Sequence, residues 1–238
     1  MNVAFRDAKL QKVFEQEGYI VLPSLLSDED ILCLTNLFAS FQIQYLDAFH
    51  TTHFSTDVNH KKIVHDAIAK IVSATTVPYL NNFIPLFGNF MVKNSDTKNC
   101  MPMHADWTYV DEKNFCSVSV WVPLIDVDEK NGCFGVVAGS HKITNIIRGP
   151  QIKQTSSLER DKVWEKRYGK LIPMKAGDAI IYNHALLHYS LANTSNIARP
   201  AINLSMAPAV PWLHYCRPET DIEVYRVADT SFYTHYNN

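Results

Sequence analysis

His104 and Asp106 are the side chains whose types and spacing most directly suggest metal chemistry, in the run Met103-His104-Ala105-Asp106-Trp107. If this run is extended, residues two apart point to the same face, and the imidazole and the carboxylate lie side by side. Two histidines and one carboxylate form the facial triad that binds non-haem iron(II) and leaves coordination positions open. A His-x-Asp pair by itself is common in proteins, so the third ligand has to come from elsewhere in the chain.

Two downstream histidines, His184 and His188, are candidates for that third ligand, and in an extended strand both would face the same way. Arg199 follows His188 by eleven residues and could form a bidentate pair with a carboxylate inside a dry pocket. Such an arginine favours a 2-oxo acid cosubstrate over a generic iron or zinc site. His184 stays open as a rival ligand, a support of the site, a substrate contact or a histidine packed on the sheet.

Other motifs in the chain do not build a competing site. The polar stretch from His50 to His65 holds four histidines but no carboxylate pattern that would complete a metal site. The His184 to His188 pair lacks the glutamate of an HExxH zinc motif, because Ala185 takes its place. Ser140 lies in no GxSxG motif, so we interpret Gly139-Ser140-His141 as a turn after a strand.

The N-terminal third carries helical patterns. Leu10, Val13 and Phe14 predict a helix that ends at Gly18, followed by a short strand over 19–22. Ser27 and the acidic residues after it predict the start of a second helix with an apolar stripe. A further amphipathic helix is expected around 67–80.

From Pro85 onward, short β-type runs alternate with turns. Strands are predicted over 86–92, 117–122, 133–137, 179–182 and 199–206. The 117–122 run alternates small polar with large apolar residues, as a half-buried strand does. Asn131-Gly132 predicts a hairpin between that run and the next. These runs indicate a mainly β fold with flanking helices, built on a double-stranded β-helix (jelly-roll, cupin-like) core.

The chain length favours one domain over residues 1–238, with a helical part over about 1–84, a jelly-roll core over about 85–210 and a C-terminal tail over 211–238. Of the 238 residues, 47% are apolar and 19% charged, and the formal net charge is −2. Without a basic excess, a nucleic-acid partner is not expected. No apolar run is long enough to span a membrane, so no membrane partner is expected either.

The five cysteines lack a CxxC pair, and the segment from Met1 to Leu10 lacks the apolar region of a signal peptide. We therefore expect reduced, buried thiols and a cytoplasmic location.

In their order, the motifs resemble the phytanoyl-CoA dioxygenase (phytanoyl-CoA hydroxylase) family of iron(II)/2-oxoglutarate oxygenases over nearly the whole chain. The matching segments are Phe14 to Pro23, Leu25-Leu26-Ser27, His104 to Trp107, the strand with Trp121, Asn131 to Cys133, Gly139 to Lys142, His188-Tyr189-Ser190, Asn193 and Arg199. One departure is Tyr189, where family members often have glycine. This side chain is expected to point outward.

The resemblance implies that His104, Asp106 and His188 are catalytic residues that ligate Fe(II). It favours His188 over His184, because the spacing from His188 to Arg199 follows the family pattern. Relatives that halogenate have a small residue in place of this carboxylate. Because Asp106 is present here, hydroxylation is the expected outcome.

For the cosubstrate, the resemblance implies that Arg199 binds the distal carboxylate of 2-oxoglutarate. It assigns Ser190 as a hydroxyl partner and Trp121 as a lining residue of the pocket. The implied reaction consumes O2 and 2-oxoglutarate, releases succinate and CO2, and hydroxylates an unactivated C–H bond.

Several alternatives stay open. The same iron site could catalyse desaturation, epimerisation or cyclisation. The fold could also serve as a non-catalytic jelly-roll binding module or as a zinc-dependent hydrolase. The expected partner is a small-molecule or carrier-bound substrate, although no basic cluster suggests coenzyme A. Substrate contacts are expected from the segments His50 to His65 and His141 to Pro173, which flank the motifs.

Overall fold

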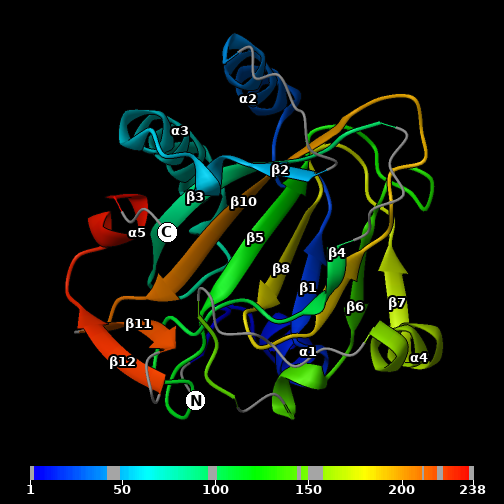
Figure 1. Ribbon diagram of the computed structural model, residues 1–238. Helices are drawn as coiled ribbons and strands as arrows, with labels where there is room; N and C mark the ends of the chain where they lie inside the picture. Colours follow the sequence, from blue (N-terminus) through cyan, green and yellow to red (C-terminus); the bar gives the residue numbers. More distant parts are fainter. Residues whose placement is uncertain are drawn as a thin grey trace.

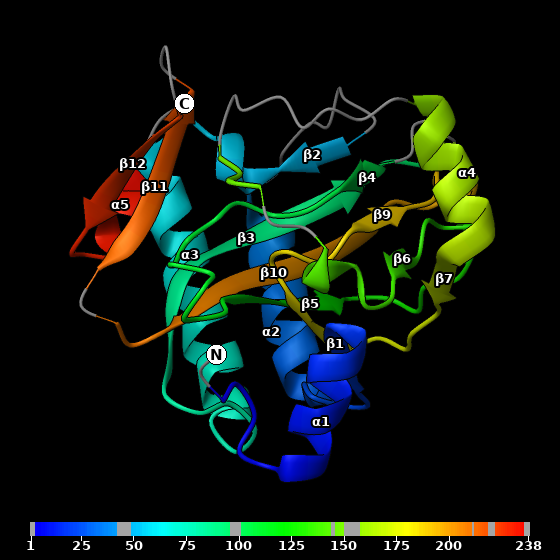
Figure 2. The ribbon, with the colours of Figure 1, turned by 90° about the horizontal axis from the view of Figure 1, so that it is seen from below.

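Two antiparallel β-sheets face each other, and helices pack on the outside of the larger one (Figures 1 and 2). The computed structural model describes residues 3–41, 49–95, 101–143, 146–149, 158–210, 212–218 and 222–235. The arrangement confirms the predicted mainly β fold with flanking helices and a jelly-roll core.

The N-terminal elements follow their local sequence signals. Helix α1 (Ala8–Glu17) ends at Gly18, whose φ of 84° is the left-handed conformation that glycine adopts without a steric penalty. Strand β1 (Tyr19–Leu22) follows, and helix α2 (Asp28–Ser40) then begins with a capping box on Ser27. All three predictions are confirmed.

Helix α3 (Val58–Thr76) begins nine residues earlier than the predicted 67–80 helix and ends sooner. Its start is fixed by the Asp57 side chain, which accepts a hydrogen bond from the backbone N–H of His60. The polar stretch rich in histidines is therefore partly helical. Before it lie β2 (Phe49–Thr51) and a short 3-10 turn (Thr52–Phe54).

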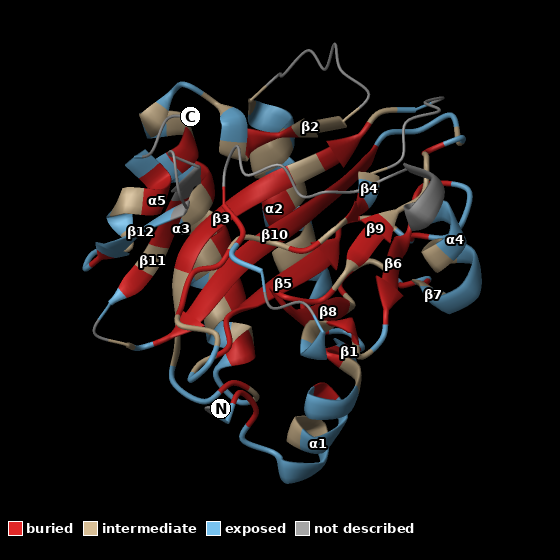
Figure 3. Ribbon diagram, turned by 60° about the horizontal axis from the view of Figure 1, so that its bottom comes forward, coloured by how far each residue is buried: buried red, intermediate tan, exposed pale blue. Residues whose placement is uncertain are grey.

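The large sheet has six strands in the order β1-β8-β5-β10-β3-β2. Its outer face packs against α1, α2 and α3 in a buried apolar cluster. Its inner face packs against the small sheet in a second cluster, and Figure 3 shows the central strands β5, β8 and β10 of the large sheet and β6 of the small sheet as buried. Besides β1 and β2, this sheet contains β3 (Phe83–Lys93), β5 (Val118–Pro123), β8 (Ala179–Asn183) and β10 (Arg199–Pro208).

Strand β5 is buried along its whole length, so the prediction of a half-buried strand is wrong. Val118, Val120 and Val122 belong to the cluster under the helices. The alternate positions, with Ser119 and Trp121, are also buried because they face the space between the sheets. The small polar residues of this strand therefore mark an internal polar site and not a solvent face.

The small sheet has the order β4-β9-β6-β7, with helix α4 beside β7 (Figure 1). The predicted hairpin at Asn131-Gly132 is wrong, because β5 and β6 lie in different sheets. Gly132 does adopt the left-handed φ of 85° that its turn signal indicates. The element bounds are β4 (Met101–His104), β6 (Phe134–Val137), α4 (Leu158–Tyr168), β7 (Gly169–Ile172) and β9 (His188–Ser190).

The C-terminal part forms the hairpin β11 (Leu213–Pro218) and β12 (Ile222–Val227), followed by α5 (Ser231–His235). Strands β1 and β2 from the N-terminal part join the large sheet, and α5 contacts α3 and β3. That residues 1–238 act as one domain stays a prediction.

Three of the cysteines, Cys116, Cys133 and Cys216, are buried as expected, and burial raises the pKa of the Cys116 thiol to about 12. Cys33 is exposed, which contradicts the expectation for that residue, and Cys100 lies outside the described residues. Within the described ranges, no helix has both the length and the apolar character to cross a bilayer.

Candidate active site

The pairing of β4 with β9 places the two histidines of the candidate triad side by side. In the antiparallel register His104 lies opposite His188, and their ring centroids are 4.2 Å apart. A β-bulge between Met101 and His104 shifts the register at the end of β4. Residues far apart in the sequence are thus brought to one point between the sheets.

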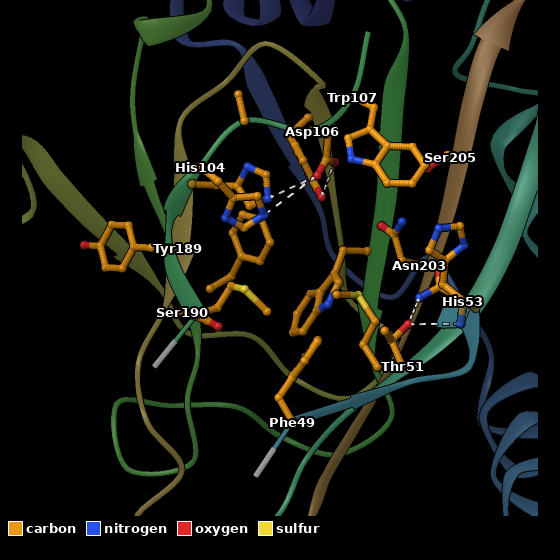
Figure 4. Close-up of a pocket in the computed structure, with 18 of the residues that line it drawn as sticks. Phe49, Thr51, His53, His104, Asp106, Trp107, Tyr189, Ser190, Asn203 and Ser205 are labelled. Atoms are coloured by element: carbon orange, nitrogen blue, oxygen red, sulfur yellow. Dashed lines mark hydrogen bonds and ion pairs between the residues drawn. The ribbon is translucent and has the colours of Figure 1, made fainter. Parts of the chain in front are cut away.

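Asp106 follows β4 and turns its carboxylate toward both imidazoles (Figure 4). Its Oδ1 lies 3.9 Å from His104 Nε2 and 3.6 Å from His188 Nε2. One ligand atom from each of the three residues lies within 4.8 Å of the others. In the part of the chain that the structure describes, this is the one group of three or more such side chains close enough to hold a metal ion.

Both histidines present the same nitrogen to this centre. His104 Nδ1 lies 2.8 Å from the carbonyl oxygen of Pro102, and His188 Nδ1 lies 3.0 Å from that of Leu186. A carbonyl oxygen only accepts, so each Nδ1 carries the proton and each Nε2 keeps a free lone pair. Backbone carbonyls therefore select the tautomer that a metal requires.

The charges around the centre favour a deprotonated donor set. Burial lowers the pKa of His188 to about 4, with a further lowering by His104, so the ring is neutral at physiological pH. Burial acts to raise the pKa of Asp106, but the neighbouring His188, His184 and His104 and a hydrogen bond from Tyr182 bring it below its ordinary value. A neutral His188 imidazole and an ionised Asp106 carboxylate thus face each other beside His104.

Two hydroxyl groups hold the second carboxylate oxygen of Asp106. Tyr182 Oη donates to Oδ2 at 3.0 Å, and Ser119 Oγ donates to the same atom at 3.1 Å. Burial and the nearby Asp106 charge raise the pKa of Tyr182 well above its ordinary value, so its hydroxyl remains a donor. Oδ2 is therefore occupied, and Oδ1 remains for a metal.

The sequence did not identify Tyr182 or Ser119 as site residues. They are paired across β8 and β5, and this pairing carries no local sequence signal.

His184 lies outside the ligand cluster. It is fully buried, with Nε2 3.0 Å from Ser119 Oγ and Nδ1 2.7 Å from Ser117 Oγ. Because Ser119 donates its proton to Asp106, it accepts from His184 Nε2–H, and His184 Nδ1 then accepts from Ser117. Of the roles left open for His184, this geometry favours support of the site over direct ligation.

Arg199, Ser190 and Trp121 line the same pocket as the three candidate ligands. Arg199 is 2% exposed, and burial lowers the pKa of its guanidinium to about 10, which leaves it charged. Its guanidinium carbon lies 5.3 Å from the centroid of the Trp121 ring. Its Nε and Nη1 have no hydrogen-bond partner among the described residues, so a buried charge is available for an anionic ligand.

The pocket has a volume of about 280 Å³ and is lined by all three residues of the triad. From the first segment expected to contact substrate, Thr51, His53 and Phe54 line it, together with Phe49 just before that segment. None of the described residues of the second segment, from His141 to Pro173, lines this pocket, and substrate contact from that segment stays a prediction. Tyr189 packs beside Met103 and Val137, and Figure 4 shows its ring pointing away from Asp106.

Arg148 is a second buried arginine that the sequence did not single out. It is fully buried, and its Nε donates to the carbonyl oxygen of Asp106 at 2.6 Å. Its Nη1 donates to the carbonyl of Ile146 at 2.6 Å, and its Nη2 forms an ion pair with Glu112. Arg148 therefore fixes the backbone that carries Asp106. Its neighbours in the sequence give no indication of this role.

The donor set fits a divalent first-row metal. Two imidazole nitrogens and one carboxylate oxygen on one side of an open pocket match the ligand type and number of non-haem iron(II) sites. The unpartnered guanidinium in the same pocket fits a small molecule with a carboxylate. Together they could hold a metal and an anionic cosubstrate next to a third molecule.

Residues 40–201 match the sequence model of the phytanoyl-CoA dioxygenase (PhyH) family. A zebrafish (Danio rerio) protein, phytanoyl-CoA dioxygenase domain-containing protein 1, is 32% identical over 102 residues. That match covers 40% of this chain and 35% of the zebrafish protein, so the chain spans about a third of that relative.

One curated relative and one solved structure match over most of the chain. A probable alpha-ketoglutarate-dependent hypophosphite dioxygenase of Stutzerimonas stutzeri is 23% identical over 86% of this chain and 80% of its own length. The structure of HygX from Streptomyces hygroscopicus, with nickel and 2-oxoglutarate bound, superposes with a TM-score of 0.61. It covers 85% of this chain and 87% of HygX at 15% identity, which establishes a shared fold.

Proposed function

The chain belongs to the phytanoyl-CoA dioxygenase family, and from that premise we propose that it is an Fe(II)- and 2-oxoglutarate-dependent dioxygenase. The proposed reaction hydroxylates an unactivated C–H bond of a small-molecule or carrier-bound substrate and releases succinate and CO2. The observation that carries the proposal is one pocket that combines a His-Asp-His cluster with a buried arginine whose Nε and Nη1 have no hydrogen-bond partner among the described residues.

His104, Asp106 and His188 are the proposed Fe(II) ligands and thus the catalytic residues. Their support is the approach of three donor atoms, the Nδ1–H bonds that free both Nε2 atoms, and the neutral state of His188. When bound there, iron(II) would supply the one-electron and dioxygen chemistry that amino-acid side chains lack.

Arg199 is the proposed partner of the distal carboxylate of 2-oxoglutarate. Two N–H donors of one planar guanidinium suit a bidentate pair, and burial strengthens such a pair. Ser190 is the proposed hydroxyl partner, since it lines the same pocket on the strand that begins with His188. The Arg199 guanidinium lies over the Trp121 ring, and this cation–π contact is the proposed support that Trp121 gives it.

Turnover without a known substrate tests this function. Family oxygenases are expected to convert 2-oxoglutarate slowly to succinate even without substrate, so the purified protein should form succinate when Fe(II), 2-oxoglutarate and O2 are all present. His188→Ala should abolish this activity, because two remaining ligands hold iron(II) weakly.

The matched control is His60→Ala, which removes a histidine that stacks on Phe41 outside the pocket and should leave the rate unchanged. Full activity in His188→Ala, or succinate formation that does not need O2, would refute the proposal. A wild-type protein that binds Fe(II) and 2-oxoglutarate but forms no succinate would favour a non-catalytic binding module.

The oxidative outcome is tested once a substrate is found. Hydroxylation leaves one oxygen atom from O2 in the product, which mass spectrometry with 18O2 detects. A product that has lost two hydrogens, or has changed only its configuration, would instead support desaturation, cyclisation or epimerisation at the same site.

A further inference from the structure

Buried polar atoms without hydrogen-bond partners are concentrated in the active-site pocket. Arg199 Nε and Nη1, Asn89 Oδ1, Asn203 Oδ1 and His53 Nε2 are all of this kind, and all four residues line the pocket. Buried polar groups in native proteins are nearly always paired, so each exception calls for a missing partner. The proposed 2-oxoglutarate accounts for Arg199, which leaves one imidazole nitrogen and two amide oxygens without a partner.

The two asparagines form a fixed pair of acceptors. Asn203 and Asn89 lie directly opposite each other on β10 and β3, and they are 7% and 4% exposed. Asn89 Nδ2 donates to Thr51 Oγ1 at 2.8 Å, and Asn203 Nδ2 donates to Ser119 Oγ at 3.4 Å. Because the NH2 groups are engaged by the protein, the amide oxygens remain as acceptors for a ligand.

His53 adds a third polar group on the same side of the pocket. Figure 4 shows His53, Thr51 and Asn203 together on the side away from His104 and Ser190. The His53 ring stacks on Phe87 with centroids 4.6 Å apart and meets Trp107 edge-on at 5.3 Å. Burial, with a smaller effect of Lys61, lowers its pKa to about 4, so the imidazole is neutral. On this side of the pocket, the polar edge of His53 therefore lies next to the aromatic rings of Phe87 and Trp107.

The charges of the pocket select against ionised substrates on this side. Of the lining residues that the structure describes, Arg199 and Asp106 are the charged ones, apart from the histidines, and both are already assigned to cosubstrate and metal. A phosphate or carboxylate would meet two amide oxygens there, and Arg199 is the one arginine or lysine among the described lining residues. An ammonium group would find no carboxylate among these residues other than Asp106, which is assigned to the metal.

We propose that Asn203, Asn89 and His53 form the substrate subsite, and that the substrate is an uncharged molecule with hydroxyl or N–H donors and an apolar face. The proposal rests on the proposed function, since it assigns the space beside the metal to substrate. The donors pair with the two amide oxygens, and a hydroxyl group, which can donate or accept, pairs with His53 Nε2. The apolar face packs on Phe87 and Trp107, as amphipathic rings do.

The test uses the Fe(II) and 2-oxoglutarate holoenzyme with a series of probes on one ring scaffold. The probes are a neutral cyclic polyol, its methyl ether, and its phosphate, carboxylate and amine counterparts, each at millimolar concentration. The readout is stimulation of 2-oxoglutarate consumption over the rate without a probe. We expect the neutral probes to stimulate and the charged counterparts to have no effect.

Variants connect the stimulation to the subsite. Asn203→Leu should raise the KM of the stimulating probe about tenfold, the order expected when a buried donor loses its acceptor. His53→Phe keeps the aromatic contacts and should raise the same KM, which guards against a folding defect in Asn203→Leu. The KM for 2-oxoglutarate should stay unchanged in both. The matched control is Ser73→Ala, which removes a buried unpartnered hydroxyl on α3 outside the pocket.

Three results would each overturn the subsite. The first is stimulation by charged probes but not by neutral ones, and the second is an unchanged probe KM in both subsite variants. The third is no stimulation by any neutral probe while 2-oxoglutarate still binds and is slowly consumed. A protein that neither binds nor consumes 2-oxoglutarate with iron present would instead refute the proposed function, so the two failures are distinguishable.

Discussion

Tyr182→Phe is the substitution that most sharply tests how the fold prepares Asp106 for metal binding. The change removes one hydroxyl, whose oxygen donates at 3.0 Å to Asp106 Oδ2, and it keeps the ring against Phe134 and His188. Ser119 remains as the single donor to that oxygen. The carboxylate is then free to rotate, and Oδ1 is no longer held toward the two Nε2 atoms.

The expected loss follows from the energy of that hydrogen bond. Hydrogen bonds to charged groups contribute about 1.5–3 kcal/mol, which corresponds to roughly a 10- to 150-fold change in an equilibrium constant. Residues that orient metal ligands through hydrogen bonds typically change metal affinity about 10- to 100-fold. We therefore expect Tyr182→Phe to weaken Fe(II) binding by about 10- to 100-fold while the protein stays folded.

Anaerobic calorimetric titration with Fe(II) measures this affinity directly. Tyr189→Phe is the matched control, because it removes a hydroxyl from an equally buried tyrosine next to His188 whose ring points away from Asp106. Its Fe(II) affinity should equal that of the wild type. If both variants bind Fe(II) with affinities within about twofold of each other, the positioning argument is wrong.

Three further predictions concern the buried ionisable side chains Arg148, His184 and Arg199. Arg148→Met leaves Glu112 without its partner and removes the hydrogen bond to the Asp106 backbone. The free energy of unfolding, measured in urea, should therefore fall by about 3 kcal/mol. An unchanged unfolding midpoint would contradict this. Burial lowers the pKa of His184 from 6.5 to about 4. As the pH falls, His184 is therefore protonated in the unfolded chain at a higher pH than in the folded protein.

The unfolding free energy of the metal-free protein should then drop between pH 6.5 and pH 4, by about 3 kcal/mol for this group, and a flat profile would refute it. Arg199→Ala should raise the dissociation constant of 2-oxoglutarate about 100-fold and leave Fe(II) affinity nearly unchanged, whereas a loss confined to Fe(II) would contradict its assignment.

Local signals explain what the sequence predicted well. The cap at Ser27, the left-handed turn at Gly18 and the two-residue spacing of His104 and Asp106 each depend on a few neighbouring residues. The choice of His188 came from a family pattern. The structure brings this residue into the candidate cluster while His184 lies outside it.

Features that depend on sheet assignment were missed. The Asn131-Gly132 turn has the expected backbone, yet it joins strands of different sheets, because a turn signal does not say which sheet the next strand enters. For the same reason the serine face of β5 was expected in solvent. The hydrogen bonds of Asp106 to Ser119 and Tyr182 became visible only with the pairing of β5 and β8.

The most direct test of the central claim is an anaerobic titration of the purified protein with Fe(II) and 2-oxoglutarate, followed in the visible spectrum. If His104, Asp106 and His188 hold iron with open positions for the 2-oxo acid, a weak metal-to-ligand charge-transfer band should appear only when both components are present. Protein that contains stoichiometric iron and excess 2-oxoglutarate, yet shows no such band, would contradict the account.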